Sequence, residues 1–169
     1  MAENVNHPDV VTYINAAEAL LPALIALNAL KPQVEARTTA LPAPPWSDGP
    51  LKGRLNITAI HSGDKGSALP GQAQTTVNRR YIAEEDAETV ISEIRETVAR
   101  AMDGTAALDW DLRVTGHLPP VSDPDGPATR RWTLARARAF GLPESDFLRY
   151  GSGTSSDFGW VQKAGLKHM

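Results

Sequence analysis

The sequence predicts an α+β fold, a two-layer ferredoxin-like sandwich in which two helices cover an antiparallel sheet. The first observation is an alternating polar and apolar segment at residues 72–81, which leads directly into an amphipathic helix at 87–102. The second is the order of segments along the chain: helix, strand, strand, helix, strand. Only the first strand of β-α-β-β-α-β is lacking from this order. We expect a short C-terminal α/β segment to follow.

An apolar stripe at helical spacing predicts the first helix, over residues 9–30. Pro8 fits its first turn, where the missing N–H is not needed. Residues 31–53 carry five prolines and two glycines, a composition that favours an extended crossing or an exposed loop. We therefore expect the first helix to end near residue 30.

Three alternating segments predict strands, at residues 54–61, 72–81 and 109–115. The turn at 62–67 predicts that the first two strands are antiparallel neighbours. In the third strand, Trp110, Leu112 and Val114 are expected to face inward. Acidic residues suit the positive end of the helix at 87–102, and Gly104 is expected to take the left-handed conformation that ends it.

A polar, proline-rich joint predicts a domain boundary, with one domain at 1–116 and a partial one at 117–169. In the second part, a helix over 127–140 begins with proline and ends before glycine. A glycine- and serine-rich turn at 151–157 follows. A serine of this turn can cap a last helix.

The composition excludes several classes of protein. A net charge of −3 over 169 residues gives no global basic field for nucleic acid or an anionic membrane. The chain has no cysteine, which excludes disulfides and thiolate metal sites. The longest apolar stretch, near residues 20–30, is too short to span a bilayer, and we recognise no signal peptide. We expect a cytoplasmic protein without membrane or nucleic-acid partners.

Few constellations in the sequence indicate chemistry by themselves. The four histidines stand in no metal-binding frame, so we interpret them as structural. Arg79 and Arg80 point to opposite faces of one strand, which predicts that one is solvated while the other holds a carboxylate in its bidentate fork. The turn at 151–157 can offer donors to an anion or be a simple helix cap. A Ser-His-Asp hydrolase can be composed, but no serine lies in a GxSxG elbow.

Four short motifs stand in order: Ile-Asn-Ala-Ala at 14–17, Ser-Gly and Ser-Ala-Leu-Pro within 62–70, Val-Asn-Arg-Arg and Glu-Glu-Asp within 77–86, and Gly-Thr-Ser-Ser-Asp at 153–157 with Gly165 beyond. In the same order, they resemble four motifs of one family. These are Val-Asn-Ala-Ile; Gly-Gly followed by Asn-Val-Ile-Pro; Leu-Asp-Ile-Arg followed by Pro-Gly-Glu-Asp; and Gly-Gly-Thr-Ser-Asp followed by Ala-Gly-Ile-Pro. The family is the zinc metallopeptidase family of aminoacylase, acetylornithine deacetylase, succinyl-diaminopimelate desuccinylase and carnosinase. The resemblance implies that residues 1–116 are that family's dimerisation domain.

The resemblance also implies roles for particular residues. Arg80 matches an arginine that reaches the substrate carboxylate, which agrees with the carboxylate fork expected on its strand. Ser67 stands where the family usually has an asparagine that holds substrate. His7 lies near the position of a histidine that polarises the scissile carbonyl across the dimer. Ser156 and Asp157 fall in the last motif and are expected to contact substrate.

The family forms dimers and hydrolyses an amide bond in small N-acyl amino acids or peptides with zinc. Its metal ligands lie before and after the segments seen here. We therefore expect a truncated piece of such an enzyme, without metal ligands or a cofactor of its own. This piece would form a homodimer or higher assembly, contact the substrate carboxylate and be inactive alone. The alternative is a self-standing ferredoxin-like module that dimerises or binds a small carboxylate without catalysis, and a serine hydrolase is the third interpretation.

Overall fold

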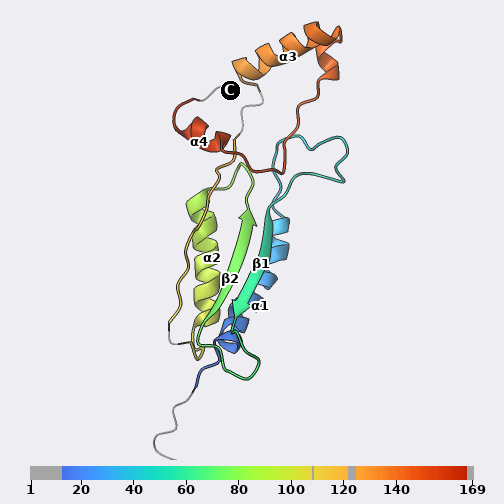
Figure 1. The fold of residues 1–169 in the computed structure, drawn as a ribbon. Helices are drawn as coiled ribbons and strands as arrows, with labels where there is room; N and C mark the ends of the chain where they lie inside the picture. The colour runs from blue at the N-terminus through green and yellow to red at the C-terminus, as the bar shows by residue number, and fades with distance from the viewer. Residues whose placement is uncertain (1–12, 108, 122–124, 167–169) are drawn as a thin grey trace, which may run out of the picture.

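The computed structural model describes residues 13–107, 109–121 and 125–166 (Figure 1). A hairpin of β1 (Arg54–Ser62) and β2 (Ala73–Arg80) forms an antiparallel sheet. The helices α1 (Ala16–Glu35) and α2 (Ala87–Met102) pack beside it. This arrangement confirms the predicted α+β fold, in which two helices accompany an antiparallel sheet and a strand of the ferredoxin-like sandwich is lacking.

The small core lies between α1, α2 and the inner face of the hairpin. Leu55 on β1 and Val34 on α1 are fully buried, and Leu30 completes the cluster. Val77 from β2 and Ile94 from α2 pack against them. More buried and more exposed residues alternate along β2 and the first part of β1, because successive side chains of a strand point to opposite faces. One face of the hairpin is therefore covered and the other is exposed.

The second helix has the limits that its amphipathic pattern predicts. The Asp86 carboxylate caps it by accepting a hydrogen bond from the backbone N–H of Thr89 over 3.0 Å. Gly104 follows the helix with a φ of 71°, in the left-handed region that favours glycine. Local signals at both ends thus determine this element.

The first helix differs from its prediction at both ends. Asn15 caps it through its side-chain oxygen, so the predicted start at residue 9 is wrong. The helix also continues through Pro32 to Glu35. Burial of Val34 in the core stabilises this last turn and offsets the local cost of the proline. Pro8, predicted to open the helix, lies outside the described residues.

The third predicted strand does not form. Residues 109–115 pair with no strand in the described part of the chain, and in Figure 1 this stretch runs past α2. Trp110 and Val114 are 39% and 51% exposed, so the expectation that they face inward is wrong. Alternation shows which side chains share a face, but it supplies no partner strand for the backbone hydrogen bonds. The sheet described here is a two-stranded hairpin.

The chain beyond this segment forms three short elements: α3 (Pro127–Phe140), the 3-10 turn η1 (Glu144–Asp146) and α4 (Phe158–Lys163). As predicted, α3 begins with a proline and ends at Gly141, whose φ of 64° is left-handed. The hydroxyl of Ser156 accepts a hydrogen bond from the first N–H of α4 over 3.2 Å, so a serine does contact this helix start. No helix of the described ranges is long and apolar enough to cross a membrane.

Candidate functional site

An open cavity lies beside the end of the hairpin at which β1 begins and β2 ends. Its walls come from the exposed face of that end, from the proline-rich loop after α1, and from two stretches of the C-terminal segment, 115–121 and 146–156. Figure 1 shows these segments meeting above the tip of β2. Residues far apart in the sequence therefore share one cavity.

Arg80 is the predicted substrate-binding residue that the structure places in this cavity. It is the last residue of β2, and its side chain lies on the exposed face of the hairpin. Its Nη1 donates a hydrogen bond to the carbonyl oxygen of Gly153 over 2.7 Å. This contact joins β2 to a turn 73 residues further along the chain, in which Ser156 also lines the cavity. Asp157 follows that turn as the N-cap of α4.

Ser67 lies at the other end of the hairpin. It belongs to the turn between β1 and β2, and the eight residues of β2 separate this turn from the far side of Arg80. At about 3.3 Å per residue, that distance is about 25 Å. Ser67 and Arg80 therefore cannot contact one small ligand within one copy of the chain. His7, the predicted catalytic residue, lies outside the described residues.

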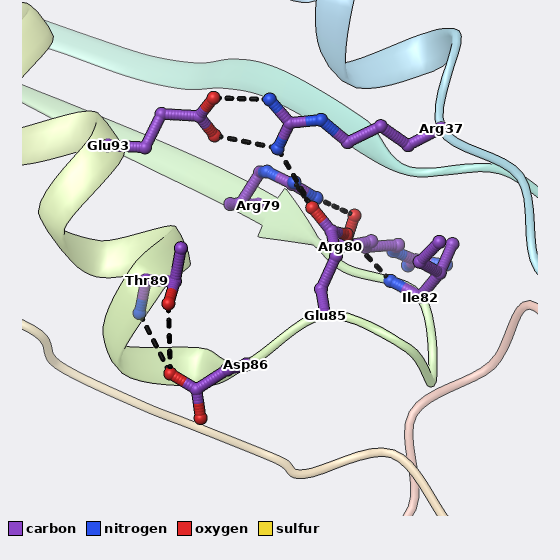
Figure 2. Close-up of polar contacts among 8 residues, drawn as sticks. All are labelled: Arg37, Arg79, Arg80, Ile82, Glu85, Asp86, Thr89 and Glu93. Atoms are coloured by element: carbon purple, nitrogen blue, oxygen red, sulfur yellow. Dashed lines mark hydrogen bonds and ion pairs between the residues drawn. The ribbon is translucent and has the colours of Figure 1, made fainter.

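Arg79 points the opposite way from Arg80 and holds a carboxylate of the protein itself (Figure 2). Its Nη2 donates to Oε1 of Glu85 over 2.5 Å. The side chains of Arg79 and Glu85 are only 5% and 12% exposed. The Nε of Arg79 is buried and has no hydrogen-bond partner in the described part of the chain. The two neighbouring arginines thus have different surroundings: Arg79 forms a buried ion pair, and Arg80 faces the cavity.

Glu85 is the centre of a network that fixes the turn between β2 and α2. Besides Arg79, it accepts hydrogen bonds from Arg37 and from the backbone N–H of Ile82, each over 2.9 Å. Arg37 also donates to Glu93 on α2, over 2.9 Å for one of the two bonds (Figure 2). Burial opposes ionisation of Glu85, but these hydrogen bonds outweigh it and lower the pKa of its carboxyl. The hydrogen bonds that Arg37 donates to Glu93 and then to Glu85 raise the pKa of its guanidinium.

An aromatic cluster adjoins the cavity, which two of its members, Tyr81 and His117, line. The Tyr81 hydroxyl lies 2.5 Å from Nε2 of His117. Trp160 meets the His117 ring edge-on, and its indole N–H donates to the His117 carbonyl oxygen over 2.9 Å. Burial, followed by the negative charges of Asp86 and Glu85, raises the pKa of Tyr81, so its phenol is protonated at neutral pH. Sequence analysis missed this cluster, because no local pattern relates Tyr81 to a histidine 36 residues away.

Two glycines permit the close contacts of the C-terminal segment. A Cβ on Gly159 would lie 1.9 Å from the carbonyl oxygen of Pro119, so only glycine fits where α4 meets that backbone. A Cβ on Gly151 would lie 2.7 Å from the Leu51 side chain. The N–H of Gly151 donates to the carbonyl oxygen of Pro42 over 2.7 Å, which ties the turn to the proline-rich loop.

The family resemblance implies zinc, and the described residues do not fit it. Within residues 13–107, 109–121 and 125–166, no three histidine, aspartate or glutamate side chains gather as metal ligands. A hydrolytic zinc site needs about three protein ligands and an open position for water. His7 and His168 lie outside the described ranges, so the prediction of no metal ligands in the chain as a whole stays a prediction.

The fold and the cavity define a small α+β domain with open sheet edges and an arginine, Arg80, that lines the cavity. The family model described as the peptidase dimerisation domain of the M20 peptidases matches residues 12–105, which is more than half of the chain. The chain therefore belongs to this family of peptidase dimerisation domains. No curated protein and no solved structure matches it. The family match includes α1, the hairpin, α2 and Arg80, while Gly153 and the rest of the last motif lie beyond it.

Proposed function

We propose that this chain supplies dimerisation and substrate-carboxylate contacts to a zinc-dependent amidohydrolase or exopeptidase. The enzyme would be of the aminoacylase, acetylornithine deacetylase, succinyl-diaminopimelate desuccinylase and carnosinase type, acting on small N-acyl amino acids or peptides. The observation that carries the proposal is the position of Arg80. It lies within the family match, its fork suits a carboxylate, and it reaches from the hairpin to the Gly153 turn across the cavity.

The placement of Ser67 supports a role for a second copy of the chain. Ser67 and Arg80 occupy opposite ends of the hairpin, so one copy brings only one of them to a given ligand. A partner copy can bring its own Ser67 turn to the Arg80 end. Each strand of the described hairpin also has one edge without a strand partner, and such edges favour pairing with another chain.

The role proposed for Arg80 is tested by ligand-induced thermal stabilisation. We expect N-acetyl-L-glutamine, which carries one carboxylate, to raise the melting temperature of the wild-type chain. Arg80→Ala should abolish this rise without lowering the melting temperature of the free protein, because the side chain is exposed. Arg95→Ala, which removes an arginine of α2 outside the cavity, is the matched control and should keep the rise. An unchanged rise in Arg80→Ala would remove Arg80 from the site.

The catalytic part of the proposal is tested by zinc content after dialysis, together with hydrolysis of a panel of N-acyl amino acids. We expect neither bound zinc nor turnover from this chain alone, because its described residues form no metal cluster. Stoichiometric zinc with turnover would contradict that expectation.

The alternative is a self-standing module that dimerises or binds a carboxylate without catalysis. Both proposals expect the lack of a metal cluster in the described ranges, so that observation does not separate them. The coding sequence upstream of the first codon distinguishes the two. A continuous frame with His-x-Asp and Glu-Glu segments supports the enzyme, and a frame without them supports the module.

A further inference from the structure

Arg54 and Arg80 are direct cross-strand partners at the cavity end of the hairpin. Partner residues in antiparallel strands project from the same face, with Cβ atoms about 4.5–5.5 Å apart. Both side chains are exposed, and both line the cavity. Like charges directly opposite each other destabilise a sheet, so folding alone does not favour this pair.

The protein itself does not neutralise these two charges. The side chain of Arg54 makes no hydrogen bond or ion pair with any residue that the structure describes, and the side chain of Arg80 donates only to the neutral carbonyl of Gly153. Arg79, on the other face of the same strand, is instead paired with Glu85. The inner arginine thus has an acidic partner within the chain, whereas the two outer arginines present their charge to the cavity.

The surroundings of the pair are also basic. Apart from Arg79, whose charge is paired with Glu85, the described residues that line the cavity include five basic and three acidic side chains: Lys52, Arg54, Arg80, Arg136 and Arg149 against Glu35, Asp48 and Asp146. Of the five, Arg149 is paired with Asp125. A ligand with two negative charges is therefore favoured over one with a single charge. The planar fork of each guanidinium can take one carboxylate in a bidentate manner.

We propose that Arg54 and Arg80 together bind two carboxylates of one substrate, so that the substrate is an N-acylated acidic amino acid. This inference rests on the proposed function, in which Arg80 contacts the substrate carboxylate, and it adds Arg54 as the residue that determines specificity. Arg54 contributes the second guanidinium, and the pair discriminates a dicarboxylate from its singly charged analogues.

Isothermal titration calorimetry of the whole chain with two nearly isosteric ligands tests this assignment. N-acetyl-L-glutamate and N-acetyl-L-glutamine differ by one carboxylate replaced by an amide. We expect the wild type to bind the first about tenfold more tightly, since its second carboxylate accepts charge-assisted hydrogen bonds that the amide cannot match in strength, even after solvent screening. Arg54→Gln should lose this preference and keep its affinity for N-acetyl-L-glutamine. Arg80→Gln should weaken both ligands.

Control variants and a third ligand make each outcome decisive. Arg95→Gln should behave as the wild type, and Arg54→Lys should give an intermediate preference because it keeps the charge but not the fork. Thermal unfolding by circular dichroism verifies that each variant is folded.

Equal affinity of the wild type for the two ligands, or a preference that survives Arg54→Gln, would overturn the inference and leave the role of Arg80 intact. Inorganic phosphate bound as tightly as N-acetyl-L-glutamate would mean an unselective anion site and would also overturn it. Unchanged binding of both ligands by Arg80→Gln, or no binding of either ligand by the wild type, would instead overturn the proposed function together with the inference.

Discussion

The domain matched by the family model and the C-terminal segment are held together in different ways. Seven of the eight buried hydrophobic residues of the described chain belong to α1, β1 and α2, and the eighth is Ala137 on α3. Beyond residue 116, large apolar side chains are exposed, including Trp132 at 65% and Phe158 at 58%. A packed core and a buried ion network hold Arg80 in the first region. The second region is attached by a few hydrogen bonds: from the Gly151 N–H to the Pro42 carbonyl oxygen, from Arg80 to the Gly153 carbonyl oxygen, and between Tyr81 and His117.

The largest effect is expected from breaking the ion network of the first region. Glu85→Ala would leave the buried Arg79 guanidinium without its carboxylate partner. Removing one member of a buried pair costs about 3–5 kcal/mol, and we expect the free energy of unfolding to fall by that amount. Urea unfolding followed by circular dichroism measures it. Glu88→Ala, in the exposed first turn of α2, is the control and should change stability by no more than about 0.5 kcal/mol.

A substitution in the core should have a similar but slightly smaller effect. Leu55 is fully buried, so Leu55→Ala should lower the free energy of unfolding by about 2–5 kcal/mol. Leu148, in the C-terminal segment, is 62% exposed, and Leu148→Ala should change it by about 0.5 kcal/mol or less. Chemical denaturation of the two variants gives the comparison directly. Equal losses would mean that the two regions do not differ in packing.

A glycine substitution should affect only the second region. Gly159→Ala places a methyl group against the Pro119 carbonyl and should weaken the docking of α4 by about 1–3 kcal/mol. Because Trp160 packs on His117 there, we expect faster limited proteolysis beyond residue 116 and a change in tryptophan fluorescence. The main unfolding transition should stay in place. Gly116→Ala, where a Cβ would meet nothing within 4 Å, is the control.

The smallest effect concerns pH. In the folded protein the pKa of Glu85 lies below its ordinary value of 4.5, so folding favours the ionised carboxylate. Its contribution to stability is complete above that value and is lost as the pH falls through the lower, folded pKa. We expect the urea midpoint to fall as the pH is lowered below 4.5, and to fall less in Glu85→Ala. Identical pH profiles for the two proteins would contradict the role given to this carboxylate.

The elements that the sequence predicted well are those with local signals at both ends. Asp86 and Gly104 mark the two ends of α2, and Pro127 and Gly141 mark the two ends of α3. Caps and amphipathic spacing were therefore sufficient to predict where these helices begin and end. The third strand failed because strand formation needs a partner that no local pattern supplies. The end of α1 failed because burial of Val34 outweighed the signal of Pro32.

The candidate site was predictable only in part. Alternation placed Arg79 and Arg80 on opposite faces of their strand, and the resemblance singled out Arg80 as the one that contacts substrate. The contact of Arg80 with the Gly153 carbonyl was not predicted. The hairpin register places Arg54 opposite Arg80, and this follows from the sequence only once the pairing is known residue by residue. The contact of Tyr81 with His117 depends on how the C-terminal segment folds back, which the sequence does not indicate.

Sedimentation equilibrium of the purified chain over a wide range of concentrations tests the central claim most directly. A peptidase dimerisation domain with open sheet edges is expected to associate, so the account predicts a mass at least twice that of one chain at high concentration, falling on dilution. The mass of a single chain at every concentration would contradict the proposal that this domain dimerises.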